Sequence, residues 1–64
     1  MLDPMATMRD TRRWADYASI EEIKLALERF RRFLDAVPNG ELAGLVRAKA
    51  HLLEEALLEK LAEE

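Results

Sequence analysis

Cysteine is absent from this 64-residue chain, and glycine, proline and aromatic residues are scarce: there are two glycines, two prolines and four aromatic side chains. Without cysteine the chain has no disulfide and no thiolate metal cluster, so its stability must come from packing, a non-thiolate metal or oligomerisation. The two glycines, Gly40 and Gly44, do not form a glycine-rich phosphate loop. Charged residues interrupt every apolar run well before the ~20 residues that a membrane-spanning helix needs.

The short length and the mixed charge further restrict the classes of function that this chain can have. Domains usually contain about 100–200 residues, so this chain has room for one small domain and not for separate catalytic and binding lobes. Half of its residues are apolar and its net charge is −3, which predicts a folded chain. We therefore expect no enzymatic activity and no cofactor. The first residues lack the basic segment and apolar run of a secretion signal, and we expect a cytoplasmic protein.

Apolar residues at alternating three- and four-residue intervals predict a first long helix over about residues 19–37. The positions are Ile20, Ile23, Leu27, Phe30 and Leu34. This spacing is typical of a helix that lies along another helix. Ser19 and Glu22 have the spacing of a capping box at its start. Pro38 ends the helix, because proline lacks a backbone N–H and pushes the preceding residue out of the α region.

A turn over residues 38–40 leads to a second predicted helix over about residues 41–63. Asn39 and Gly40 tolerate positive φ, and so short a connection makes the second helix run antiparallel to the first. Its apolar positions include Leu42, Leu45, Val46, Leu53, Leu57 and Leu61. They cover too broad an arc to be buried by one neighbouring helix, so a second neighbour is expected. Lys49 lies in the same arc, where its methylene stem would pack while its ammonium group reaches solvent.

The predicted fold is therefore all-α: an antiparallel helical hairpin over residues 19–64, preceded by a short N-terminal arm over residues 1–18. A single core of this size supplies only about 3–5 kcal/mol. We therefore expect two hairpins to dimerise into a four-helix bundle, with the apolar positions of both helices as the core and dimer interface. Antiparallel stacking of the two copies would bring the basic half of the first helix to the acidic C-terminal end of the second.

The N-terminal arm is predicted to be partly helical or flexible, and two arrangements fit its sequence. Asp3 followed by Pro4 is typical of an N-cap and the first turn of a short helix. Alternatively, residues 11–17 form helical turns that continue into the first long helix. In both arrangements we expect less order before Asp10.

The candidate partner-binding residues lie in this arm: Arg12, Arg13, Trp14 and Tyr17. Tryptophan, tyrosine and arginine dominate protein interface hot spots, but arginine also contacts phosphates and aromatic rings stack on bases. A negative net charge is atypical of a nucleic-acid-binding domain. The arginines also have an internal explanation, since Arg12 and Arg13 can fold back onto the acidic end of the second helix.

The leading hypothesis is a small non-enzymatic protein–protein interaction module, acting as a regulator, adaptor or accessory subunit. Its partner would be itself, as a homodimer, or another helical protein. The alternative is an RNA- or DNA-binding helical-bundle regulator that uses the arginine-rich arm and the first helix.

His51, the only histidine, is followed by Glu54 and Glu55 at helical spacing. Metal sites in helical bundles also combine histidine with glutamate on neighbouring turns, but in the reverse order and with the ligands pointing inward. We therefore predict a surface histidine and no metal site.

Overall fold

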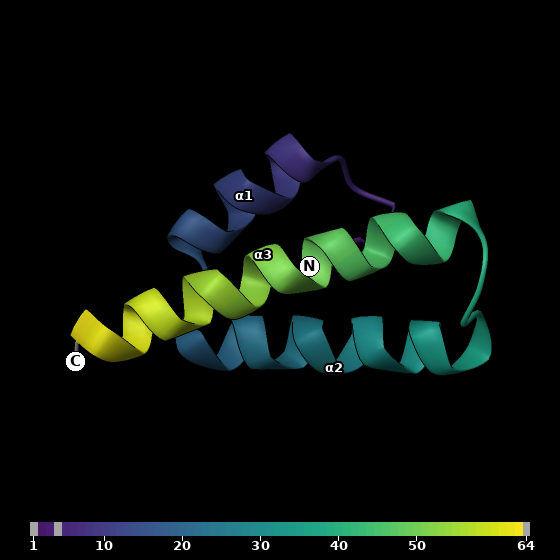
Figure 1. Cartoon of the computed structure of the whole chain (residues 1–64). Helices are drawn as coiled ribbons and strands as arrows, with labels where there is room; N and C mark the ends of the chain where they lie inside the picture. Colours follow the sequence, from purple (N-terminus) through teal and green to yellow (C-terminus); the bar gives the residue numbers. More distant parts are fainter. Residues whose placement is uncertain (1, 4, 64) are drawn as a thin grey trace.

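The computed structural model describes residues 2–3 and 5–63, and these residues form three α-helices (Figure 1). They are α1 (Met8–Tyr17), α2 (Ile20–Ala36) and α3 (Glu41–Glu63). The described part of the chain contains no strand. The all-α prediction is therefore confirmed, but a hairpin of two helices with an arm does not describe the chain, because a third helix is present.

The two long helices, α2 and α3, lie side by side and run in opposite directions (Figure 1). The connection between them reverses at Gly40, whose φ of +105° is a conformation that favours glycine. The guanidinium group of Arg47 donates to the backbone carbonyl of Pro38 and so ties the connection to α3.

Ten residues of the N-terminal arm form α1, which includes the residues 11–17 that one of the two predicted arrangements made helical. Thr7 caps this helix, its hydroxyl oxygen accepting from the Asp10 amide at 3.1 Å. The Asp3 carboxylate accepts from the Met5 amide at 2.9 Å, but the chain makes only a turn there. The predicted role of Pro4 lies outside the described residues.

α1 does not continue into α2, because Ala18 and Ser19 have extended backbones. Instead α1 packs against α3. Its buried residues are Thr11 and Ala15, followed by the buried Ala18 just after the helix, and the Thr11 hydroxyl donates to the Thr7 carbonyl at 2.8 Å. The broad apolar arc of α3 thus has its second neighbour within the same chain, where the sequence led us to expect another subunit.

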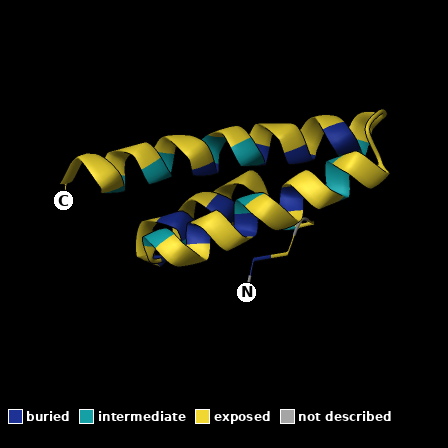
Figure 2. Cartoon of the chain, turned by 90° about the horizontal axis from the view of Figure 1, so that it is seen from below, coloured by how far each residue is buried: buried dark blue, intermediate teal, exposed yellow. Residues whose placement is uncertain are grey.

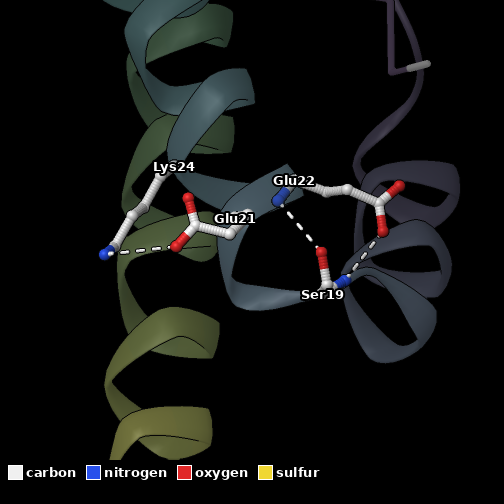
Figure 3. Close-up of polar contacts among 4 residues, drawn as sticks. All are labelled: Ser19, Glu21, Glu22 and Lys24. Carbon is white, nitrogen blue, oxygen red and sulfur yellow. Dashed lines mark hydrogen bonds and ion pairs between the residues drawn. The ribbon is translucent and has the colours of Figure 1, made fainter.

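The junction between α1 and α2 is held by the predicted capping box, which the structure confirms (Figure 3). The Glu22 amide donates to the Ser19 hydroxyl at 3.1 Å, and the Ser19 amide donates to the Glu22 carboxylate at 3.0 Å. The bond from the Ser19 amide to the Glu22 carboxylate, followed by the interaction of that carboxylate with the Ser19 side chain, holds the pKa of Glu22 below its ordinary value of 4.5. The capping box therefore fixes where α2 begins and where the chain turns away from α1.

The buried residues lie along the sides of the helices that face one another (Figure 2). The largest fully buried apolar side chains are Phe30, Ile23, Leu53 and Val46. Lys49 is 5% exposed, so nearly the whole side chain is buried and not only its stem. Every buried side-chain nitrogen and oxygen of the described residues has a hydrogen-bond partner. No helix in the described ranges is both long and apolar enough to cross a bilayer.

Candidate functional site

The predicted core and interface residues occupy three different environments. Ile23, Phe30, Val46 and Leu53 are buried, Ile20, Leu27, Leu34, Leu42 and Leu57 are half-buried, and Leu45 and Leu61 are exposed. Leu45 is 50% exposed and Leu61 is 45% exposed, so neither belongs to the core of this chain. The buried and half-buried positions are nearly all in one apolar cluster. The surface available to a partner must therefore be sought among the half-buried and exposed residues.

The candidate partner-binding residues of the arm lie on α1, where Arg13, Trp14 and Tyr17 line one groove and Arg12 lines another. Arg12 and Arg13 are exposed, Trp14 is half-buried against the apolar cluster, and Tyr17 is 88% exposed. Trp14 lines a shallow groove with Leu25, a leucine of α2 that is 53% exposed. Trp14 thus contributes to the core with part of its ring and to the surface with the rest.

Acidic side chains accompany both arginines. Arg12 lines the groove between α1 and α3 together with Asp16, Glu55 and Glu59. This placement agrees with the expectation that Arg12 folds back onto the acidic end of the chain. Arg13 shares its groove beside Trp14 and Tyr17 with Asp10 and Glu22. The basic charge of α1 is therefore balanced locally by carboxylates from all three helices.

A second surface lies between α2 and α3, and we call it the open face. Its grooves are lined by the apolar side chains of Ile20, Leu27 and Leu34 of α2 and of Ala50 and Leu61 of α3. The half-buried Leu57 follows Ala50 on the same line of α3. The three α2 residues are seven positions apart, and so are Ala50 and Leu57, so each set follows one line along its helix. The groove in the middle of this face is lined by α2 and α3 alone.

The open face is on the side of the α2–α3 pair that α1 does not cover. At about 100° per residue, Ala26 lies on one side of the buried Ile23–Phe30 line and Leu27 on the other. Ala26 lines the groove with Trp14 of α1, whereas Leu27 lines the groove between α2 and α3. One side of the pair is thus packed against α1, while the other leaves a line of half-buried leucines beside solvent.

Charged residues border the open face on both helices. Glu28, Arg31 and Asp35 of α2 and Glu54 of α3 line the same groove. Glu28 pairs with Arg32 at 2.9 Å, whereas Arg31, Asp35 and Glu54 take no part in that pair or in the pairs Glu21–Lys24 and His51–Glu55. Opposite charges therefore face each other across the groove without forming an ion pair.

His51 lies on the exposed surface of α3, and its Nε2 is 3.1 Å from the Glu55 carboxylate. Glu54 takes no part in this contact and lines the open face instead. The residues that the structure describes contain no group of three or more histidine, aspartate or glutamate side chains placed to hold a metal ion.

Sequence analysis missed several buried small residues. Ala43 is fully buried on α3, and Thr11 and Ala15 are buried on α1. The signal for Ala43 is present, because it precedes Val46 by three residues and Ala50 by seven. Thr11, Ala15 and Ala18 also have helical spacing, but small residues carry little weight in a pattern based on large apolar side chains.

Comparisons with protein-family models, with curated proteins and with solved structures find no match to this chain. Any function must therefore be argued from the surfaces described above.

Proposed function

We propose that this protein is a small non-enzymatic protein–protein interaction module, a regulator, adaptor or accessory subunit, that packs its open face against a helical partner. The observation that carries this proposal is the asymmetry of the α2–α3 pair. One side is covered by α1, whereas the other keeps Leu27, Leu34 and Leu57 half-buried and Leu61 45% exposed. Lines of apolar residues seven positions apart are the pattern with which helices pack against other helices.

The energetics also favour a partner. A single core of this size supplies about 3–5 kcal/mol. Apolar surface contributes roughly 25 cal/mol for each Å² removed from water, so covering the open face would add to that stability. The partner is either a second copy, giving the four-helix bundle expected from the sequence, or another helical protein.

Two matched glutamate variants test this function. Leu61→Glu places a charge on the open face, and Leu25→Glu places one beside Trp14 on the side of α1; the two leucines are 45% and 53% exposed. Association should be measured by sedimentation equilibrium and by capture of partners from a lysate of the source cells. We expect Leu61→Glu to abolish association and Leu25→Glu to preserve it.

Two results would contradict the proposal. If neither variant changes self-association or capture, the open face is not a binding surface. If only Leu25→Glu abolishes association, the binding surface is instead the α1 side with Trp14 and Tyr17. Circular dichroism of both variants must show unchanged helicity for either result to count.

The alternative function, binding of RNA or DNA, has one favourable observation: Arg12 and Arg13 are exposed, and Arg13 lines one groove with the exposed Tyr17. Phosphate neutralisation makes affinity fall steeply with salt. If this alternative holds, the chain binds an RNA or DNA oligonucleotide in low salt, and an Arg12→Ala, Arg13→Ala double variant loses that binding. If the protein–protein proposal holds, the double variant associates with its protein partner as the wild type does.

A further inference from the structure

From the charges that border the open face we infer that its occupant is an amphipathic helix of another protein, with lysine or arginine on both sides of its apolar stripe. This inference rests on the proposed function, because it names the chemistry of the partner that the same surface binds. A second copy of this chain becomes an outcome of the test.

The groove of the open face nearer the turn has an apolar floor. Leu27 and Leu34 of α2 and Ala50 of α3 line it, and all three are half-buried and packed against the apolar cluster of the core. A helix that lies in such a groove inserts apolar side chains at three- and four-residue spacing. The floor therefore requires an apolar stripe on the partner, but it does not distinguish one helical partner from another.

The charges on the border of this groove do distinguish between partners. Carboxylates come from both helices, Glu28 and Asp35 from α2 and Glu54 from α3, and Arg31 lines the groove with them. Glu28 is already paired with Arg32 at 2.9 Å, so its charge is balanced within α2. Asp35 and Glu54 are exposed and take part in none of the ion pairs among the described residues. Each helix thus offers one carboxylate that a cation of the partner can contact.

The position of these two carboxylates predicts where the partner carries its basic residues. Asp35 and Glu54 border the groove from different helices, so a helix lying between them meets one carboxylate on each flank. Charged residues beside the apolar stripe select the partner when helices pack together. Opposite charges across an interface favour association, and like charges oppose it. A second copy of this groove would bring the same excess of carboxylates, so charge disfavours it as the occupant.

The other end of the open face has no such excess. The groove there is lined by two glutamates and two lysines, namely Glu21, Glu63, Lys24 and Lys60. Glu21 and Lys24 contact each other at 3.9 Å. The acidic border is therefore confined to the end near the turn, and we expect the basic residues of the partner at that end.

Two designed helical peptides test the chemistry of the partner. Both carry leucine at the a and d positions of each heptad, and they differ at the flanking e and g positions, where one has lysine and the other glutamate. Fluorescence anisotropy of each labelled peptide measures its binding to the full chain, at concentrations where the peptide alone is monomeric. The lysine peptide should bind about tenfold more tightly, and this preference should decrease as salt is raised.

Glu54→Lys and Glu55→Lys separate the groove from the general effect of charge. Both make the same change at adjacent positions of α3, but Glu54 lines the open face, whereas Glu55 contacts His51 and lines the groove beside α1. Glu54→Lys should weaken binding of the lysine peptide by about tenfold, and Glu55→Lys by less than about twofold. Asp35→Lys should act as Glu54→Lys does. The double variant Asp35→Lys, Glu54→Lys should prefer the glutamate peptide.

The outcomes separate this inference from the proposed function. Equal binding of the two peptides, or equal weakening by Glu54→Lys and Glu55→Lys, overturns the basic partner. If Leu61→Glu still abolishes that binding, the open face remains a binding surface. A chain that binds neither peptide also overturns the inference. Self-association that Leu61→Glu abolishes would then identify a second copy as the occupant and leave the function standing. If Leu61→Glu changes no association either, the function fails with it.

Discussion

The ammonium group of Lys60, in the last turn of α3, donates to the backbone carbonyl oxygen of Asp16 in α1 at 3.4 Å, across 44 residues of sequence. Asp16 lies in the last turn of α1, where backbone carbonyls have no partner within their own helix. A cation at this position also interacts favourably with the helix dipole. Lys60 therefore links the end of α3 to the end of α1.

Removing this charge should loosen α1 without disturbing the core. Lys60→Met keeps the methylene stem and should lower the free energy of unfolding by roughly 0.3–1 kcal/mol, the usual contribution of a cation at a helix C-terminus. Lys24→Met is the control, since its contact with Glu21 is an exposed pair at 3.9 Å. Urea denaturation at a fixed protein concentration measures the free energy of unfolding of both variants. Equal losses in the two variants would show that the Lys60 contact has no special role.

Two leucines of α3 should respond very differently to truncation. Leu53 is fully buried and Leu58 is 67% exposed. Leu53→Ala should destabilise the chain by about 2–5 kcal/mol, because it removes buried apolar surface and leaves a cavity. Leu58→Ala should change stability by less than about 0.5 kcal/mol.

Thermal and urea denaturation measure the stability of both leucine variants. Leu53→Ala could leave too little folded chain to measure, so Leu53→Met, expected to cost less than about 1.5 kcal/mol, provides a second point. Similar losses at Leu53 and Leu58 would contradict the placement of Leu53 in the core.

The capping box should make stability depend on pH at the acidic end. The folded chain lowers the pKa of Glu22, so the stabilisation from its ionised form is complete above pH 4.5 and is lost as the pH falls through the lowered value. The stability difference between wild type and Glu22→Gln should therefore shrink as the pH is lowered from about 7 to about 3. Glu21→Gln is the control, because Glu21 does not bond the Ser19 amide. A difference that stays constant with pH would contradict the assignment.

The Ser19 side of the same capping box has its own test. Ser19→Ala removes the acceptor for the Glu22 amide and should cost about 0.5–2 kcal/mol. Ser19→Gly should cost only a few tenths of a kcal/mol, because glycine is itself tolerated at an N-cap. Equal losses for the two substitutions in urea denaturation would mean that the hydroxyl does not act as a cap.

The two glycines should respond to alanine with opposite signs. A Cβ at Gly44 would meet no atom within 4 Å, so Gly44→Ala should stabilise α3 by about 0.8–1.0 kcal/mol through helix propensity. A Cβ at Gly40 also has space, but its φ of +105° strains any other residue, so Gly40→Ala should destabilise the chain. Urea denaturation of both variants measures whether each substitution raises or lowers the free energy of unfolding. Loss of stability in Gly44→Ala would point to a packing role for this glycine in an assembly.

Local signals in the sequence predicted the long helices well. Ser19 and Glu22 cap α2 as expected, and Glu28 pairs with Arg32 at 2.9 Å. These features depend on residues three or four positions apart, which a helix brings together by its own geometry. The apolar spacing likewise placed Ile23, Phe30, Val46 and Leu53 in the core, because helical phase alone decides which side chains share a face.

The packing of α1 was harder to predict because its buried residues are the small Thr11 and Ala15. Small side chains allow two helices to approach closely. They give only a weak apolar pattern in the sequence, because that pattern is recognised mainly from large apolar residues. The broad arc of α3 correctly required a second neighbour, but sequence spacing is the same whether that neighbour belongs to the same chain or to another. Leu45 and Leu61 illustrate the consequence, since each has core spacing and each is exposed.

The amino-acid sequence by itself determined that this protein is helical, where its two long helices begin and end, and which residues form the centre of its core, because capping, proline and helical phase act over a few neighbouring residues. Only the tertiary structure decided that α1 covers one side of the α2–α3 pair and that Lys60 reaches Asp16. It also decided that Arg31 and Glu54 border the uncovered side together. Those relationships depend on how whole helices pack, and packing is determined by the combined shape of side chains that lie far apart in the sequence.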